Sequence, residues 1–345
     1  MVKRKLSTSG LRADGEVLGE REIIEVIRAR LDVLSDLPVP FGDDVSAVDL
    51  DGERVAVLKT DMLVAATDVP CGMSFWQAAR KAVVMNVSDF AAKGVAPVAA
   101  LVSIGLPARF PKADMEEIAS GLNAGAREYG AYVIGGDTGE ASDVVIAVFM
   151  FGTAERGKLV LRGGARVGDV VAVSGFFGKS AAGLRILIDN CMASGELRDV
   201  LVDSVFMPSA RLKEGLALSS SGAVSASIDS SDGLAWSLCE LARMSGVGFV
   251  LDTVPVADEV TRFAKLNRLD ALDLALYGGE EYELVATVKP ELWTKAVSMI
   301  SGVGGQLLPI GKVIRGKQVV LEMGSQKRLV EARGYEHFKS NSWRN

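Results

Sequence analysis

The order of strand-like and helix-like segments is the feature that most constrains how this chain can fold. Runs rich in β-branched and apolar residues predict strands, and runs with apolar residues at helical spacing predict helices. The strands are expected at residues 54–61, 98–107, 131–136, 143–152, 169–175, 224–229, 281–288 and 306–313. The helices are expected at residues 19–31, 75–94, 113–130, 179–190, 209–222 and 231–246, and between the last two strands. Because strands and helices do not alternate strictly, the pattern favours an α+β fold over a doubly wound parallel sheet.

Segment 153–169 is rich in glycine and arginine and has little periodicity, which is typical of a domain boundary. A chain of 345 residues is long enough for two domains with their own cores. We therefore expect a mobile polar arm at 1–18, an N-terminal domain at 19–153 and a C-terminal domain at 154–345. The strands VAALVSIGL and DVVIAVFMFG of the first domain are too apolar to face water, so we expect them to build a dimer core.

Composition and charge exclude several classes of protein. The formal net charge of −6 argues against non-specific nucleic-acid binding. The N-terminus lacks the apolar core of a signal peptide, and no window approaches the roughly 20 apolar residues of a membrane span. Cys71, Cys191 and Cys239 lack C-x-x-C spacing, which favours a reducing cytoplasm. The single histidine, His337, leaves no partner for Ser-His or Cys-His catalysis elsewhere in the chain.

The string GFFGKS at 175–180 looks like a nucleotide-binding loop, but it is too short to be one. A Walker A loop has four residues between its glycines, whereas two residues separate Gly175 from Gly178. Lys179 is therefore expected to begin a helix, and Glu281, farther along the chain, to be solvated. A phosphate site, if present, is expected elsewhere.

Aspartates next to glycine or serine recur at the ends of expected strands and the starts of expected helices. They are Asp43, Asp44, Asp61, Asp89, Asp137, Asp229 and Asp232. Each alone is typical of a turn or a helix N-cap. Asp89 differs because VVMNVSDFAAK places it in an apolar helix, where a carboxylate needs a hydrogen-bonded partner or a cation. Several such carboxylates in one cleft would suit Mg²⁺, which prefers oxygen ligands and bridges to phosphates.

Eight motifs, in order, then resemble the thiamine-monophosphate kinase family of the aminoimidazole-ribonucleotide synthetase (PurM-like) superfamily. They are FGDDVSAV, LKTDMLV, RKAVVMNVSDFAAKG, VIGGDT, LVLRGGARVGD, SIDSSDGL, YGGEEYEL and GYEHF. The resemblance spans about residues 19–338. It implies a two-domain PurM-like architecture whose N-terminal α/β domain contributes strands to the core of a cytoplasmic homodimer. It also implies Mg²⁺-dependent transfer of the ATP γ-phosphoryl group to thiamine monophosphate, giving thiamine diphosphate.

The resemblance also implies roles for single residues. The implied magnesium ligands are Asp44, Lys59 (through its carbonyl), Thr60, Asp61, Asp89, Asp137, Asp229 and Asp232. The implied ATP contacts are Gly136, Arg162 and Ser231. The implied substrate contacts are Glu280 and Tyr335, together with Asp68, which stands where many bacterial members have a histidine. Lys59 stands where the family usually has serine. No covalent nucleophile is expected, since metals and Arg162 suffice to neutralise charge in phosphoryl transfer.

Two alternatives remain at this level. One is another ATP-dependent enzyme of the superfamily. A selenophosphate synthetase would have a reactive cysteine near its N-terminus, whereas the first cysteine here is Cys71. A hydrogenase-maturation enzyme would end in cysteine, whereas this sequence ends in SNSWRN. The other alternative is a non-catalytic nucleotide-sensing module of the same fold, which the full set of aspartates disfavours.

Overall fold

The computed structural model describes residues 18–32, 34–324 and 326–338, so nearly all of the arm expected at 1–18 lies outside the described residues. Contacts divide the chain into a large unit, 36–334, and a small unit made of 1–35 and 335–345. In the small unit, helix α1 (Glu20–Arg28) confirms the first expected helix. The Glu20 carboxylate accepts a hydrogen bond from the backbone N–H of His337, and Arg21 pairs with Glu336 at 3.3 Å.

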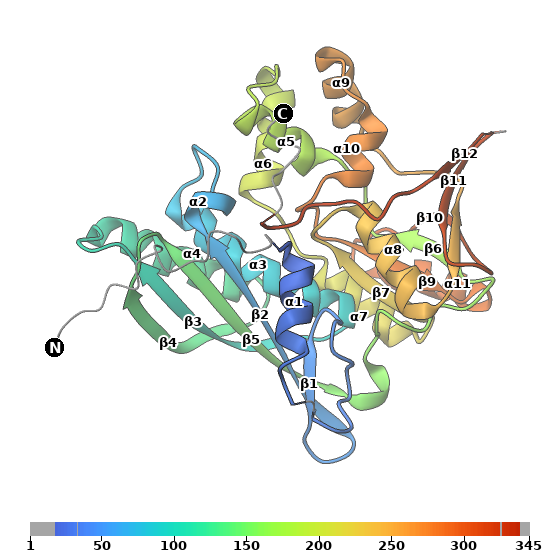
Figure 1. The fold of residues 1–345 in the computed structure, drawn as a ribbon, viewed down its shortest axis with the longest axis horizontal. Coiled ribbons are helices and arrows are strands. Elements are labelled where there is room, and N and C mark those ends of the chain that lie inside the picture. Colours follow the sequence, from blue (N-terminus) through green and yellow to red (C-terminus); the bar gives the residue numbers. More distant parts are fainter. Residues whose placement is uncertain (1–17, 33, 325, 339–345) are drawn as a thin grey trace. The chain divides into compact units, whose positions relative to one another are not determined.

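The first half of the large unit forms a five-stranded sheet in the order β1-β2-β5-β3-β4 (Figure 1). Its strands are β1 (Ser46–Asp49), β2 (Arg54–Val64), β3 (Pro97–Leu106), β4 (Tyr132–Glu140) and β5 (Val145–Glu155). Neighbouring strands are antiparallel except for β3 and β4, which are parallel and joined by helix α4 (Lys112–Glu128). Asp61 and Asp137 therefore lie inside β2 and β4 and not at strand ends as expected.

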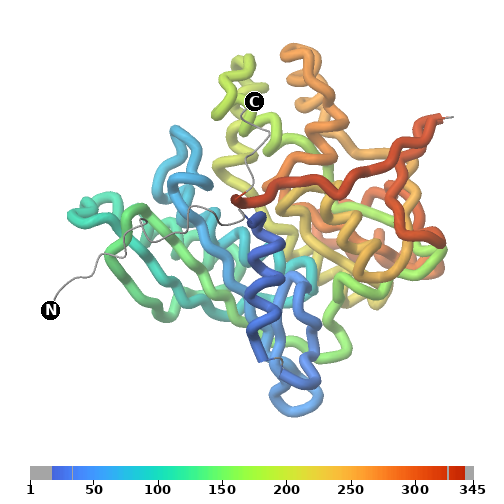
Figure 2. Tube along the Cα trace, in the orientation of Figure 1, coloured from blue at the N-terminus to red at the C-terminus, as the bar shows by residue number. Residues whose placement is uncertain are grey.

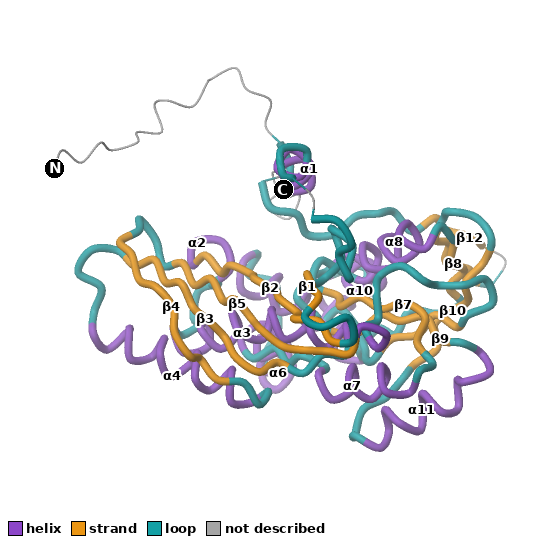
Figure 3. The backbone as a smooth tube through the Cα atoms, turned by 90° about the horizontal axis from the view of Figure 1, so that it is seen from below, coloured by secondary structure: helices purple, strands orange, loops and turns teal. Residues whose placement is uncertain are grey.

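Helix α3 (Phe75–Lys93) and helix α4 pack together along one face of this sheet (Figure 3). Helix α3 begins at a capping box between Ser74 and Gln77 and ends at Gly94, which adopts a left-handed conformation as the sequence predicted. A Cβ atom on Gly121 of α4 would lie 2.2 Å from the Trp76 carbonyl oxygen, so only glycine permits this helix spacing. The single-turn helix α2 (Ala65–Asp68) follows β2 directly.

The second half of the large unit forms a seven-stranded sheet in the order β12-β11-β8-β10-β6-β9-β7. Its strands are β6 (Val170–Val173), β7 (Val224–Ser230), β8 (Gly248–Leu251), β9 (Glu283–Val288), β10 (Leu308–Ile314), β11 (Val319–Met323) and β12 (Gln326–Leu329). Pairing is antiparallel except between β8 and β11. Figure 2 traces this half from green through yellow to red.

Helices lie on both sides of the second sheet, with α8 on one side and α7 and α11 on the other (Figure 3). The helices of this half are α5 (Lys179–Ile188), α6 (Gly195–Phe206), α7 (Leu212–Ser221), α8 (Leu234–Ser245), α9 (Asp258–Asn267), α10 (Ala271–Tyr277) and α11 (Trp293–Gly302). Short 3₁₀ turns occupy Arg156–Lys158 and Pro290–Leu292. Helix α3 also packs against β7 and β9, so this one helix contacts both sheets.

The mixed sheets and their helices confirm the α+β prediction. The sequence patterns did not predict the helices α6, α9 and α10. They also did not predict the short strands β1, β8, β11 and β12. Strands of four or five residues are too short to show a clear period, and α6 is held by packing against α5. No helix within the described ranges is long and apolar enough to cross a membrane.

Candidate metal and phosphate site

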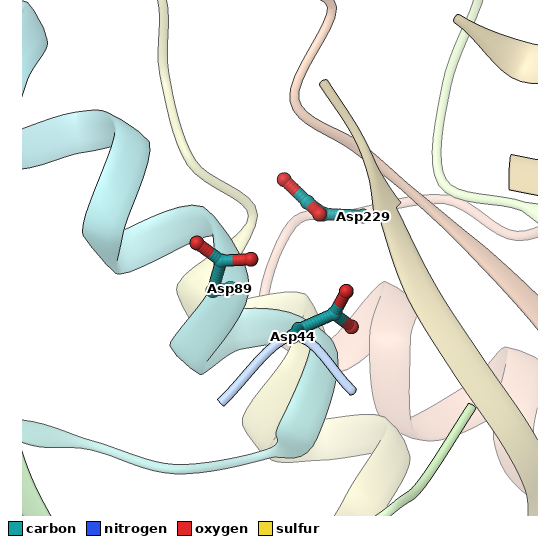
Figure 4. A group of neighbouring side chains, drawn as sticks. All are labelled: Asp44, Asp89 and Asp229. Carbon is teal, nitrogen blue, oxygen red and sulfur yellow. The ribbon is translucent and has the colours of Figure 1, made fainter. Parts of the chain in front are cut away.

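Three buried carboxylates meet where helix α3 contacts the second sheet. Asp44 ends the turn before β1, Asp89 projects from α3 and Asp229 projects from β7 (Figure 4). One carboxylate oxygen from each lies within 4.8 Å of the other two. Helix α3 brings the three together because it packs against both sheets. The buried carboxylate that the helix sequence predicted at Asp89 is confirmed.

Crowding of the carboxylates disfavours their ionised forms. Burial, opposed by the Lys59 charge and reinforced by Asp229, Asp61 and Asp44, holds the pKa of Asp89 well above its usual range. Burial, followed by the charge of Asp44, raises the pKa of Asp229 to about 6, although the Ser88 hydroxyl donates to its carboxylate at 2.6 Å. Such groups gain most from a cation placed between them.

Asp44 differs from the other two because basic groups hold it in the ionised form. Burial pushes its pKa up, but the charges of Lys93 and Arg162 outweigh burial, so the pKa is lowered. The Lys93 ammonium, fully buried, lies 2.8 Å from Asp44 and 2.7 Å from Asp43. The Arg162 guanidinium donates to Asp44 through Nε at 2.7 Å and also through Nη2. Sequence reasoning missed Lys93, whose signal was a lysine four residues after Asp89 in an apolar helix.

Lys59 places a second ammonium at the edge of the cluster. Its Nζ lies 2.9 Å from Asp89 Oδ2 and 3.2 Å from Asp61 Oδ1. Lys59 and Asp61 are two residues apart on β2, so both side chains point to the helix-covered face. Thr60 between them is exposed, so its side chain lies on the opposite face of the sheet.

The donor set fits magnesium. All the clustered ligand atoms are hard carboxylate oxygens, and Mg²⁺ takes oxygens at about 2.1 Å, which puts neighbouring ligands about 3–4 Å apart. Their mutual distances of up to 4.8 Å admit one ion with a small adjustment. A divalent charge among the three carboxylates would offset their mutual repulsion.

Asp137 lies apart from this cluster within the chain. Asp137 on β4 is in register with Ser103 on β3, and Ser103 pairs with Ala147 on β5. Ala147 in turn pairs with Met62 on β2, so these four residues form one row on the exposed face of the sheet. Asp61 belongs instead to the adjacent row, on the helix-covered face, and the strands β5 and β3 separate β2 from β4. Gly136 precedes Asp137 and approaches the Val102 carbonyl so closely that a Cβ atom would lie 1.9 Å from its oxygen.

The loop after β7 links the cluster to a second polar group around Glu280. The Ser231 carbonyl accepts a hydrogen bond from the Glu280 N–H at 2.6 Å, and Asp232 follows Ser231 directly. The Glu280 carboxylate lies 2.5 Å from the buried Lys81 ammonium, which also donates to the Asp68 carbonyl at 3.3 Å. Two predicted substrate contacts, Glu280 and Asp68, therefore share Lys81, a partner that sequence reasoning missed.

Glu280 and Asp68 differ in how their side chains are held. The Asp68 carboxylate accepts from the Val64 N–H at 2.7 Å, which turns it back toward the strand β2. Glu280 has a φ of 63°, a left-handed conformation that is uncommon for a residue with a side chain. Tyr335 belongs to the small unit, where its hydroxyl lies 3.3 Å from Nδ1 of His337.

The GFFGKS string is not free to bind an anion. Helix α5 begins at Lys179, as predicted, and Gly178 precedes it with a φ of 100°. The Glu281 carboxylate accepts hydrogen bonds from the backbone N–H groups of Gly178 at 2.7 Å and Ser180 at 3.2 Å. The expectation that Glu281 is solvated was wrong, because its carboxylate takes the place that a phosphate would have at this helix N-terminus.

Comparison with known proteins places this architecture in a family. The family model for the AIR synthase related protein N-terminal domain matches residues 42–154, and that for its C-terminal domain matches residues 166–324. The thiamine-monophosphate kinase of Nitrosopumilus maritimus is 34% identical over 322 residues, which cover 93% of this chain and 99% of that protein. The thiamine-monophosphate kinase of Pyrococcus horikoshii is 35% identical over 307 residues, covering 88% and 93%.

A solved structure agrees with these sequence matches. AaThiL complexed with AMPPCP and TMP matches with a TM-score of 0.81 at 29% identity, covering 92% of this chain and 97% of that one. The fold and the acidic site thus define an α+β enzyme of the AIR synthase related, or PurM-like, class. Within that class the chain belongs to the thiamine-monophosphate kinase family, as its ordered motifs indicated.

Proposed function

We propose that this protein transfers the γ-phosphoryl group of ATP to thiamine monophosphate, forming thiamine diphosphate and ADP by direct in-line transfer. The observation that carries the proposal is the buried cluster of Asp44, Asp89 and Asp229 with Arg162 beside it. The names of the relatives and the AMPPCP and TMP bound to AaThiL support both substrates.

The three clustered aspartates would hold magnesium, together with Asp61 on β2 and Asp232 after β7. Bound magnesium would bridge the ATP phosphates and neutralise the charge that develops during transfer. Arg162 keeps one-fifth of its side chain exposed, so its guanidinium can donate to a phosphate while Nε stays on Asp44. Metal ions and Arg162 would suffice to neutralise the charge on the transferred group, and we therefore infer that no phosphoenzyme forms.

The remaining implied residues would bind the substrates. Glu280, fixed by Lys81, would recognise the thiamine moiety together with Asp68 and Tyr335. Ser231 and Gly136 would contact ATP. Asp137, Thr60 and the Lys59 carbonyl stay predicted metal ligands. The family matches at 42–154 and 166–324 support a boundary near residue 154 between the two proposed domains.

A substrate screen tests this function. The purified protein is incubated with Mg²⁺-ATP and, separately, thiamine, thiamine monophosphate, aminoimidazole precursor or selenide, and ADP release is measured. We expect ADP only with thiamine monophosphate, with thiamine diphosphate as the second product. Turnover with another acceptor would favour a different enzyme of the class, and no turnover with any acceptor would favour a nucleotide sensor.

We also propose a homodimer that works in the cytoplasm. The face of the first sheet opposite the helices exposes large apolar side chains, including Met62 (57% exposed), Leu101 (44%) and Tyr132 (56%). Monomeric proteins rarely leave such a patch in water, and a second copy of this sheet would cover it. Light scattering at micromolar concentration should give twice the chain mass of 36.4 kDa, and a monomer would contradict the proposal.

A further inference from the structure

The Lys59 ammonium occupies a position inside the acidic site that a cation would otherwise take. It bridges Asp89 Oδ2 and Asp61 Oδ1 at 2.9 and 3.2 Å.

Lys93 shows what a purely structural lysine looks like in the same site. Its ammonium contacts Asp43, Asp44 and the Ser227 carbonyl at 2.7–2.8 Å, and its side chain is completely buried. The Lys59 side chain is 21% exposed and lies on the side of the cluster formed by β2. The Lys59 side chain is therefore partly accessible to solvent, whereas the Lys93 side chain is not.

Among the groups joined by ion pairs or by the carboxylate cluster, one divalent ion balances the charge. When ionised, the carboxylates of Asp43, Asp44, Asp61, Asp89 and Asp229 contribute −5. The cations Lys59, Lys93 and Arg162 contribute +3, so a charge of −2 remains, which one Mg²⁺ neutralises. With an uncharged residue at position 59 the remainder is −3, which favours a further divalent ion.

We propose that the Lys59 ammonium is a tethered cation that replaces one divalent metal ion beside Asp61 and Asp89. The inference rests on the proposed function, since it assigns this lysine a role in the same metal-dependent site. Lys59 thereby makes the nucleotide-free protein hold fewer divalent ions than a protein with a neutral side chain at this position. It also supplies a fixed positive charge near the transferred phosphoryl group without the need to bind an ion from solution.

The test counts Mn²⁺ ions, used as the probe for divalent binding, by electron paramagnetic resonance titration of the nucleotide-free protein. We expect Lys59→Ser to bind one more Mn²⁺ per chain than the wild type, or to bind Mn²⁺ at least about tenfold more tightly, because a unit positive charge near a dication has been removed. The matched control is Lys179→Ser, which removes a lysine 3.6 Å from Glu259 and should leave Mn²⁺ binding unchanged. Lys59→Gln provides a second neutral variant in case the serine variant fails to fold.

The outcomes separate this inference from the proposed function. If the wild type binds Mn²⁺ but both neutral variants bind the same number of ions with the same affinity, Lys59 does not replace a metal, and the proposed function is unaffected. If neither the wild type nor the neutral variants bind Mn²⁺ at millimolar concentration and the wild type yet turns over thiamine monophosphate with Mg²⁺-ATP, the ions arrive only with nucleotide, and the inference fails. Absence of both binding and turnover would reject the proposed function itself.

Discussion

Two regions of this molecule resemble phosphate-binding sites, and they differ in which of their polar groups already have partners. At the start of α5, two backbone N–H groups point at an anion site, but the Glu281 carboxylate already accepts both hydrogen bonds. At the aspartate cluster, three carboxylates face one another and two of them have raised pKa values. The N–H groups of the first region already have an acceptor, whereas the second region brings together three carboxylates that a cation could join. A motif therefore matters less than whether its polar groups already have partners.

The largest effect is expected from Asp89→Asn. Removing this carboxylate should lower turnover at least about a hundredfold, because it takes away charge that would hold a phosphate-bridging metal. The variant should fold, since the substitution relieves repulsion from Asp229 and Asp61. Steady-state kinetics should be compared with those of Asp189→Asn, an aspartate in the α5 region. Turnover within a factor of a few of wild type would contradict the metal-cluster interpretation.

Arg162→Ala should have the next largest effect. Loss of a guanidinium that lies on Asp44 and can reach a phosphate should lower kcat/KM about ten- to a hundredfold. The control is Arg166→Ala, an exposed arginine of the same segment. Both variants should be measured at saturating Mg²⁺, and equal activity of the two would remove Arg162 from the site.

Lys179→Ala should have a small effect. Lys179 begins α5, and its ammonium lies 3.6 Å from the Glu259 carboxylate. Its replacement by alanine should therefore raise the KM for ATP by about tenfold or less (about 1.4 kcal/mol). Measuring it beside Arg162→Ala compares the two regions directly. An inactive Lys179→Ala protein alongside active Asp89→Asn and Arg162→Ala proteins would reverse the assignment of the phosphate site.

The smallest effect is expected from Glu281→Gln, which should change how the stability of the protein depends on pH. Burial, only partly offset by the bonds from Ser180 and Gly178, raises the pKa of Glu281 from 4.5 to about 7. The folded state thus keeps its proton to a higher pH than the unfolded state, and this group lowers stability as pH rises from about 4.5 to 7. Glu281→Gln should have a higher Tm than wild type at pH 8 and a similar Tm at pH 5. A Tm difference that is the same at both pH values would contradict the raised pKa.

Much of the fold and part of the site could be predicted from local sequence. Ser74 and Gln77 mark the start of helix α3 and Gly94 marks its end, because helix capping depends only on residues that are near in sequence. Asp89 was recognisable as a buried carboxylate that needs a partner or a cation, because its apolar neighbours in that helix require burial. The ordered motifs identified the family, and the comparisons confirmed it.

Only the tertiary structure decided which charges meet. The pairing of Lys59 with Asp61 and Asp89 depends on how α3 packs on β2, and that of Lys93 with Asp43 depends on the turn before β1. Glu281 reaches the α5 amides from more than a hundred residues away, so no local pattern predicts that it fills the GFFGKS site. Sequence periodicity reports which residues are buried, because burial follows from the face of each element. It does not report partners distant in sequence, because these depend on the packing of elements that the chain joins by long connections.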